Sequence, residues 1–289
     1  MIASRFVDLA KDKFEIVSVD EKTVDITDAA AVEKYFGENE FDSILNFSAF
    51  TNVDAAEAQR GDEEGLVWRL NVEGVKNLIK ESKKSNIFLI QISTDFVFPG
   101  TPKDPGPYVE DAQLPKDLDS SISWYGWTKA QAEKEITSVS IDAAILRLSY
   151  PFRAAEYKIK LDWARNLLKL FDEHKLYPLF TDQVQSVLLV DDLLIPLSKI
   201  IDLNLSGIFH VVSSDTTSPY EIGLYLLEKY ANKRVDVPKG LMTEFLKTSG
   251  RAPRPVLGGL NTSKTEDTLE MHFRSWREMI DDFLNQLRF

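Results

Sequence analysis

Residues 87–100 read IFLIQISTDFVFPG, and this stretch decides the fold class of the chain. Its first seven residues are almost continuously apolar, as expected of a strand that is buried on both faces of a parallel sheet. Hydroxyl and carboxylate side chains follow at once, at Ser93, Thr94 and Asp95. Open α/β sheets hold their ligands beyond the carboxyl ends of the strands, so we expect a ligand site here.

Strand and helix patterns alternate on both sides of this stretch. We expect strands at 14–19, 43–49, 87–93 and 143–149, and helices at 1–13, 28–36, 62–84 and 124–136. This order is typical of an α/β fold, a Rossmann-like doubly wound parallel sheet with helices on both faces. The first 150 residues are therefore predicted to form one domain.

The alternation changes after residue 150. We expect helices at 158–174, from 191, at 219–231 and at the carboxyl end, a strand at 207–214 and a loop at 251–268. Residues 151–289 are predicted to form a smaller lobe that is interleaved with the first domain.

Composition excludes several classes of protein. The 289 residues carry 34 Lys and Arg against 46 Asp and Glu, a net charge of −12, which argues against a nucleic-acid partner. No apolar run is long enough to cross a membrane, and the amino end does not resemble a signal peptide. The absence of cysteine excludes disulfides and is compatible with a cytoplasmic location. The three histidines are scattered, and we expect no metal site.

A tyrosine and a lysine open the helix predicted at 124–136. Tyr125 and Lys129 are four residues apart and therefore share a helix face. An ammonium beside a phenol lowers the pKa of the phenol, which suits a tyrosine that exchanges a proton with a carbonyl or an alcohol. The hydroxyl of Thr94 could fix the same oxygen. Taken alone, the pair could equally be an exposed tyrosine and lysine on a helix surface.

With these motifs the chain resembles the extended short-chain dehydrogenases/reductases, and more closely the dTDP-4-dehydrorhamnose reductase family. The resemblance covers nearly the whole chain in the family's order and spacing. It is carried by VDITD (24–28), NFSAFTNVDAAE (46–57), LNVEGVKNL (70–78), STDFVFPG (93–100), YGWTKAQAE (125–133), LRLSYPF (146–152), TDQVQS (181–186) and RPVLGGLNTSK (254–264).

The resemblance implies that Thr94, Tyr125 and Lys129 are catalytic, with Tyr125 protonating the C4 oxygen of a dTDP-4-dehydro-6-deoxysugar as hydride arrives from the nicotinamide. The first domain would bind NADH or NADPH. Asp20 would accept from the adenosine ribose and tilt the preference toward NADH, although it could also be an ordinary turn residue. The other residues implied to contact the cofactor are Asp25, Ile26, Ser48, Ala49, Phe50 and Ile92, together with Tyr125 and Lys129.

The second lobe would bind the substrate. The residues implied to contact the nucleotide sugar are Thr51, Val53, Asp95, Phe96, Tyr150, Arg254 and Asn261. Phe96 and Tyr150 could instead be core aromatics, and Arg254 a solvated loop charge. The partner implied is thus a small nucleotide sugar, with a homodimer as a further possibility.

The chain departs from the family pattern at three phenylalanines, Phe47, Phe50 and Phe96, which suggest a less polar sugar site. It also has only 13 glycines, and none before Gly37. We therefore expect that a strand and a glycine-rich turn of about 10–14 residues are missing before Met1. Two alternatives to the reductase stay open: an epimerase or dehydratase of the same superfamily, and a non-catalytic nucleotide-binding regulatory subunit.

Overall fold

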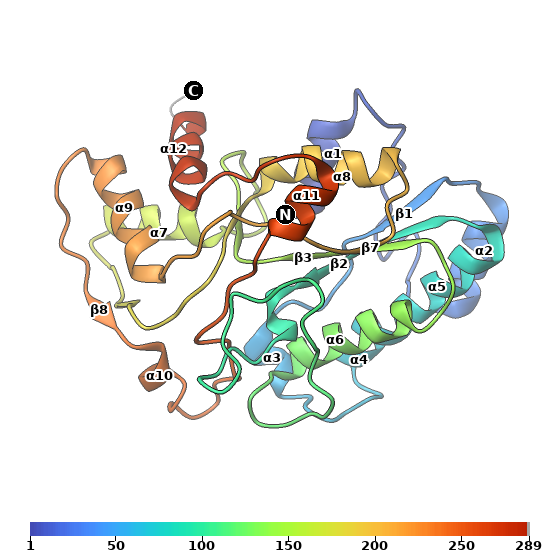
Figure 1. The fold of residues 1–289 in the computed structure, drawn as a ribbon, viewed down its shortest axis with the longest axis horizontal. Helices are drawn as coiled ribbons and strands as arrows, with labels where there is room; N and C mark the ends of the chain where they lie inside the picture. The colour runs from blue at the N-terminus through green and yellow to red at the C-terminus, as the bar shows by residue number, and fades with distance from the viewer. Residues whose placement is uncertain (288–289) are drawn as a thin grey trace.

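The computed structural model describes residues 1–287 and is built around a parallel sheet of four strands (Figure 1). The strands β1 (Ser43–Asn46), β2 (Phe88–Thr94), β3 (Ala143–Leu148) and β7 (Gly207–His210) lie in the order β1-β2-β3-β7. Ile90 of β2 pairs with Leu45 of β1 and with Ala144 of β3. The expected α/β class is confirmed, as are the strands expected near 43–49, 87–93, 143–149 and 207–214.

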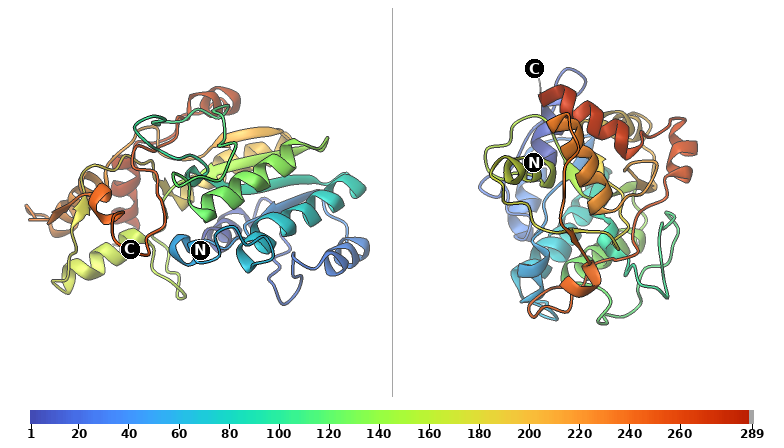
Figure 2. Two further views of the ribbon diagram at one scale, coloured as in Figure 1. Left: turned by 90° about the horizontal axis from the view of Figure 1, so that it is seen from below. Right: turned by 90° about the vertical axis from the view of Figure 1, so that its left-hand side faces the viewer.

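Helices cover both faces of the sheet (Figure 2). One face packs on α2 (Ala29–Glu38), α5 (Gly74–Ser85) and α6 (Trp124–Thr137). The other packs on α1 (Ile2–Ala10), α8 (Leu194–Asp202) and α11 (Ser263–Leu269). Residues alternate along β2, since Leu89 contributes to the first core and Ile90 to the second. Burial on both faces explains why this strand is apolar throughout.

The strand expected at 14–19 is wrong. Residues 15–20 run without helix or strand, and within residues 1–287 the strand β1 pairs only with β2. A β-rich run becomes a strand only where its backbone groups meet a partner, and this segment has none in the described sheet. Its side chains still alternate, because Phe14 and Ile16 pack on the core while Val17 is 56 % exposed.

A second core lies beyond the sheet, on the left of Figure 1. It is formed by α7 (Trp163–Asp172), α9 (Pro219–Ala231) and α12 (Trp276–Leu287) with the short parallel pair β4 (Pro151–Phe152) and β6 (Leu188–Leu189). A further pair joins β5 (Leu179–Phe180) to β8 (Lys239–Gly240). The chain returns to the main sheet between these elements, at the 3-10 turn η3 (Val190–Leu193), α8 and β7.

Several expected boundaries are wrong. The helix expected at 62–84 is divided into α4 (Leu66–Trp68), a π-helical turn η1 (Arg69–Glu73) and α5. The helix expected at 158–174 starts only at Trp163, where Asp162 caps it. The loop expected at 251–268 contains α11, and α3 (Val53–Glu57) and α10 (Met242–Phe245) were not expected. No helix within residues 1–287 has the length and apolar character that a membrane span requires.

Candidate active site

The predicted catalytic residues meet where β2 ends and α6 begins. Thr94 is the last residue of β2, and its hydroxyl accepts a hydrogen bond from the amide of Phe96 in the 3-10 turn η2 (Asp95–Val97). Ser123 caps α6 by accepting from the amide of Gly126. A Cβ on Gly126 would lie 2.0 Å from the Phe96 carbonyl oxygen, so only glycine allows α6 to approach the turn this closely. This contact brings Tyr125 beside Thr94.

The ring of Tyr125 is enclosed by side chains that the sequence assigned to the ligand site. It shares an apolar cluster with Phe50, Val53 and Phe96, and its ring centroid lies 5.8 Å from that of Phe96. Burial raises the pKa of Tyr125 to about 12, while a hydrogen bond with the Thr94 hydroxyl opposes this rise. The phenol therefore holds its proton at neutral pH, as a proton donor must.

Lys129 follows one turn later and is 2 % exposed. Its Nζ donates to the Ile92 carbonyl oxygen over 2.7 Å, which places the predicted cofactor residue Ile92 beside the predicted catalytic lysine. Burial lowers the pKa of Lys129 to about 8. The expectation that this ammonium lowers the pKa of Tyr125 is wrong for the structure: the ammonium is directed to a strand carbonyl, and desolvation dominates at the phenol.

Asp95 and Tyr150 border the same cluster. The Asp95 carboxylate accepts from the Ser149 hydroxyl over 2.7 Å, and burial raises its pKa to about 6. The ring of Tyr150 lies 6.3 Å from that of Phe96, and its hydroxyl accepts from Gln183 over 2.9 Å. Tyr150 has a φ of 37°, a conformation that costs free energy for a side chain of this size and that often occurs at ligand sites.

The loop after β1 carries the predicted cofactor residues Ser48, Ala49 and Phe50. The amide of Ser48 donates to Asn46, and Ala49 is half-buried. Sequence reasoning gave no role to Asn71, whose side chain accepts from the Phe50 amide over 2.8 Å and donates to Thr128 over 2.9 Å. Asn71 thereby ties the loop to α6. The signal was present, since Asn71 belongs to the LNVEG motif.

Two further residues after β1, Thr51 and Phe47, are placed differently. Thr51 is exposed, directly before α3. Phe47 does not join the Tyr125 cluster, because its ring lies 6.5 Å from that of Phe6 on α1 and belongs to the core behind the sheet. The suggestion that all three unusual phenylalanines line the sugar site is therefore wrong for Phe47.

The carboxyl-terminal loop contacts α3 through Arg254, which forms an ion pair with Asp54 over 2.9 Å. Arg251 pairs with the same carboxylate over 3.2 Å. Arg254 also acts electrostatically on Tyr150, so its charge lies near that side chain. Asn261 has local partners instead. Its side-chain oxygen accepts from the Ser263 amide at the start of α11, and its backbone carbonyl faces a ring nitrogen of His210.

The residues predicted to hold the adenosine lie in the segment that connects α1 to α2. Asp20 is exposed, and its Oδ1 accepts from the amides of Lys22 and Thr23, which lowers the pKa of the carboxyl. Asp25 accepts from the Thr27 amide, and the carbonyl of Ile26 accepts from Asn77.

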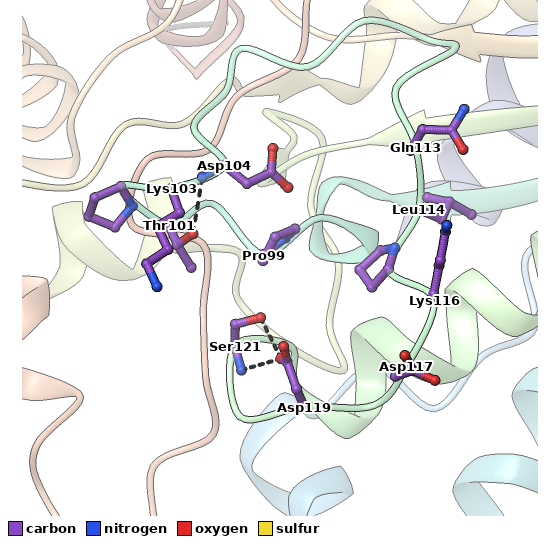
Figure 3. A pocket seen from close by; sticks show the side chains of 12 residues that line it. Pro99, Thr101, Lys103, Asp104, Gln113, Leu114, Lys116, Asp117, Asp119 and Ser121 are labelled. Carbon is purple, nitrogen blue, oxygen red and sulfur yellow. Dashed lines mark hydrogen bonds between the residues drawn. The ribbon is translucent and has the colours of Figure 1, made fainter.

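A surface hollow of about 740 Å³ lies in the loop that connects η2 to α6, and none of the predicted site residues lines it (Figure 3). Its rim includes Thr101, Asp104 and Lys116, and Asp119 accepts from both the amide and the hydroxyl of Ser121. None of the three predicted catalytic residues lines it, so the hollow is not the candidate active site.

A doubly wound sheet with a threonine, a tyrosine and a lysine at its carboxyl edge defines the class of the extended short-chain dehydrogenases/reductases. Within that class, residues 4–289 match the family model of the RmlD substrate binding domain, and the chain belongs to this family.

Several characterised relatives are similar along most of the chain. The spore coat polysaccharide biosynthesis protein SpsK of Bacillus subtilis is 27 % identical over 94 % of this chain and 89 % of its own length. The dTDP-4-dehydrorhamnose reductase of Mycolicibacterium smegmatis is 26 % identical over 92 % of this chain and 76 % of its own. The crystal structure of dTDP-4-dehydrorhamnose reductase from Bacillus anthracis in complex with NADP superposes with a TM-score of 0.85, at 25 % identity, covering 99 % of this chain and 95 % of that one.

Proposed function

We propose that this chain reduces the 4-keto group of a dTDP-4-dehydro-6-deoxysugar with NADH or NADPH. The observation that carries the proposal is the convergence of Thr94, Tyr125 and Lys129 at one strand end, next to the predicted sugar residues Asp95 and Tyr150. Homology supports the coarser statement, a sugar-nucleotide reductase that uses a nicotinamide cofactor.

In the proposed reaction the Tyr125 hydroxyl donates its proton to the C4 oxygen of the sugar, and Thr94 binds the same oxygen. A raised pKa keeps the phenol protonated until the oxygen becomes basic. The apolar wall of Phe50, Val53 and Phe96 keeps water from this proton. The cofactor, when bound, supplies the hydride.

The residues present fit the nicotinamide end of such a cofactor better than its pyrophosphate. A buried ammonium at Lys129 suits the ribose hydroxyls; the Ile92 carbonyl contacts that ammonium, and Phe50 packs in the cluster of Tyr125, one helical turn away. The pyrophosphate is usually held by a glycine-rich turn at a helix amino end, and the residues before Gly37 contain no glycine. Related structures contain NADP or NAD, and the exposed carboxylate of Asp20 favours NADH in our proposal.

A second candidate is a nucleotide-binding regulatory subunit without turnover, favoured by the apolar Phe50, which departs from the family pattern and packs in the Tyr125 cluster. The two functions separate in one assay. The chain is mixed with NADH or NADPH and a dTDP-4-keto-6-deoxysugar, and consumption of the reduced cofactor is followed by absorbance. We expect turnover that is abolished by Tyr125→Phe and retained by Tyr108→Phe, a control in which another buried tyrosine loses its hydroxyl. Binding of dTDP without turnover supports the regulatory subunit instead.

A further inference from the structure

A buried cluster of charges lies directly behind the candidate active site. Glu133 of α6 and Arg147 of β3 are each 1 % exposed and form an ion pair of 2.7 Å between Nη2 and Oε2. The Arg147 Nε also contacts both carboxylate oxygens, at 3.1 and 3.2 Å. The remaining bond to Glu133 comes from the hydroxyl of Ser93, the residue before Thr94. The carboxylate is thus fixed from two neighbouring strands.

The groups on the far side of Arg147 bring no second negative charge to it. Its Nη1 donates to the Glu110 carbonyl over 3.1 Å and contacts Nε2 of His210 over 3.2 Å. An arginine only donates, so Nε2 accepts and the ring carries its proton on Nδ1, toward the Asn261 carbonyl 2.8 Å away. His210 is therefore neutral. The Glu110 carboxylate is turned away, to the amide and hydroxyl of Thr265.

Lys129 is the other cation near Glu133. The two residues are four apart on α6 and so share a helix face. Within residues 1–287 no carboxylate lies within ion-pair distance of the Lys129 Nζ, whose one hydrogen bond is to the Ile92 carbonyl. Of the other groups near Lys129, Tyr125 on the same helix is neutral, and β2 offers the ammonium only a backbone carbonyl. The negative charge available to this buried ammonium is that of Glu133.

We propose that Glu133 is a positioning residue for Lys129: held by Arg147 and Ser93, it supplies the negative charge that keeps the buried ammonium charged beside the end of β2. The proposal rests on the proposed reductase function only in giving Lys129 a catalytic task. An ion pair with Arg147 alone adds little to stability, because both charges lose water on burial. The electrostatic effect of Glu133 on Lys129 gives the buried pair a function other than stability.

The direction of the electrostatic effect supports this assignment. Burial lowers the pKa of Lys129, and Glu133 is the group that opposes the fall. The two side chains are beyond ion-pair distance, so we expect the effect of the Glu133 charge to be at the lower end of what nearby opposite charges produce, about one pKa unit. Without the Glu133 charge, Lys129 is expected to lose its proton below pH 8 and to be largely neutral under physiological conditions.

The test is a titration of Lys129 in the full chain labelled with ¹³C-lysine, followed at Cε by NMR. The signal is assigned by its loss in Lys129→Arg. In Glu133→Gln we expect the titration midpoint to fall by about one pH unit. In Glu81→Gln, where an equally buried glutamate of α5 loses its charge, we expect no change. An unchanged midpoint in folded Glu133→Gln overturns the proposal.

Glu133→Gln leaves Arg147 buried without its counter-charge. If this variant does not fold, Glu133→Gln/Arg147→Met replaces it. This double variant removes both charges and is read by the same signal, with a lower midpoint expected. The proposal and the reductase function fail separately. If the chain has no turnover but the midpoint falls, the charge effect stands and the enzyme does not. If the chain turns over and the midpoint is unchanged, the role of Glu133 is refuted while the reductase stands.

Discussion

The approach of α6 to the turn after β2 makes Gly126 the most exacting position in the candidate site. A Cβ there would lie 2.0 Å from the carbonyl oxygen and 2.9 Å from the carbonyl carbon of Phe96. Both are backbone atoms, which cannot rotate away as a flexible side chain can. Gly126→Ala must therefore move the helix or the turn by more than about 1 Å to reach an ordinary contact distance.

The expected magnitude is a balance of two terms. Overpacking of a well-packed interior costs about 1–3 kcal/mol, and a backbone clash lies at the upper end of that range. Alanine recovers up to about 1 kcal/mol in helix propensity. We expect a net loss of about 2 kcal/mol in the free energy of unfolding. Because a shift of 1 Å separates Tyr125 from Thr94, the turnover number should fall by about 100-fold.

The assay is urea unfolding followed by far-ultraviolet circular dichroism, together with turnover of the reduced cofactor. The matched control is Gly37→Ala in α2, where a Cβ meets nothing within 4 Å. That change should stabilise the chain by about 0.5–1 kcal/mol and leave turnover intact. If Gly126→Ala unfolds at the same urea concentration as the parent and turns over normally, the close approach does not constrain the site.

Three further outcomes follow from the charges. Burial lowers the pKa of His210 to about 3, so between about pH 6.5 and pH 3 the unfolded chain binds a proton at this residue that the folded chain does not. The free energy of unfolding is therefore highest above about pH 6.5 and decreases as the pH falls toward 3. In His210→Gln the urea midpoint should decrease less steeply over this range. The pKa of Lys129 is about 8, so turnover should decrease as pH rises through 8, and Lys129→Arg should remove that decrease. Asp54→Asn removes the ion pairs of Arg251 and Arg254. A partly exposed ion pair contributes about 1 kcal/mol or less, so the KM for the nucleotide sugar should change by a few-fold while kcat stays constant.

The sequence was sufficient to predict that Thr94, Tyr125 and Lys129 lie together, because this prediction depends on local signals. An apolar strand ends at Thr94 and a capped helix begins at Ser123, and both facts are visible in a few consecutive residues. The same reasoning failed where a side chain acts across the fold. Asn71 lies in a recognisable motif and Arg147 in an apolar strand, but neither pattern names a partner, Thr128 for the first and Glu133 for the second. Such partners are set by strand order and helix packing.

The pKa values show the same division. Spacing puts Lys129 and Tyr125 on one helix face, and from this the sequence predicted a depressed pKa for the phenol. Residue spacing says nothing about burial, and burial raises the pKa of Tyr125 while it lowers that of Lys129. It also leaves open where the ammonium points, which the Ile92 carbonyl determines.

The segment 14–19 shows why a correct side-chain pattern can still give a wrong element. Phe14 and Ile16 contact the core while Glu15 and Val17 are exposed, which is the alternation of a strand with one buried face, and from Val17 to Asp20 every residue is exposed. Alternation records only which side chains face the core. A strand also needs a neighbour for its amides and carbonyls, and the nearest edge of the described sheet, β1, pairs with β2 alone. The order of apolar and polar residues therefore predicts which face is buried, and only the assembled sheet determines whether the backbone is paired.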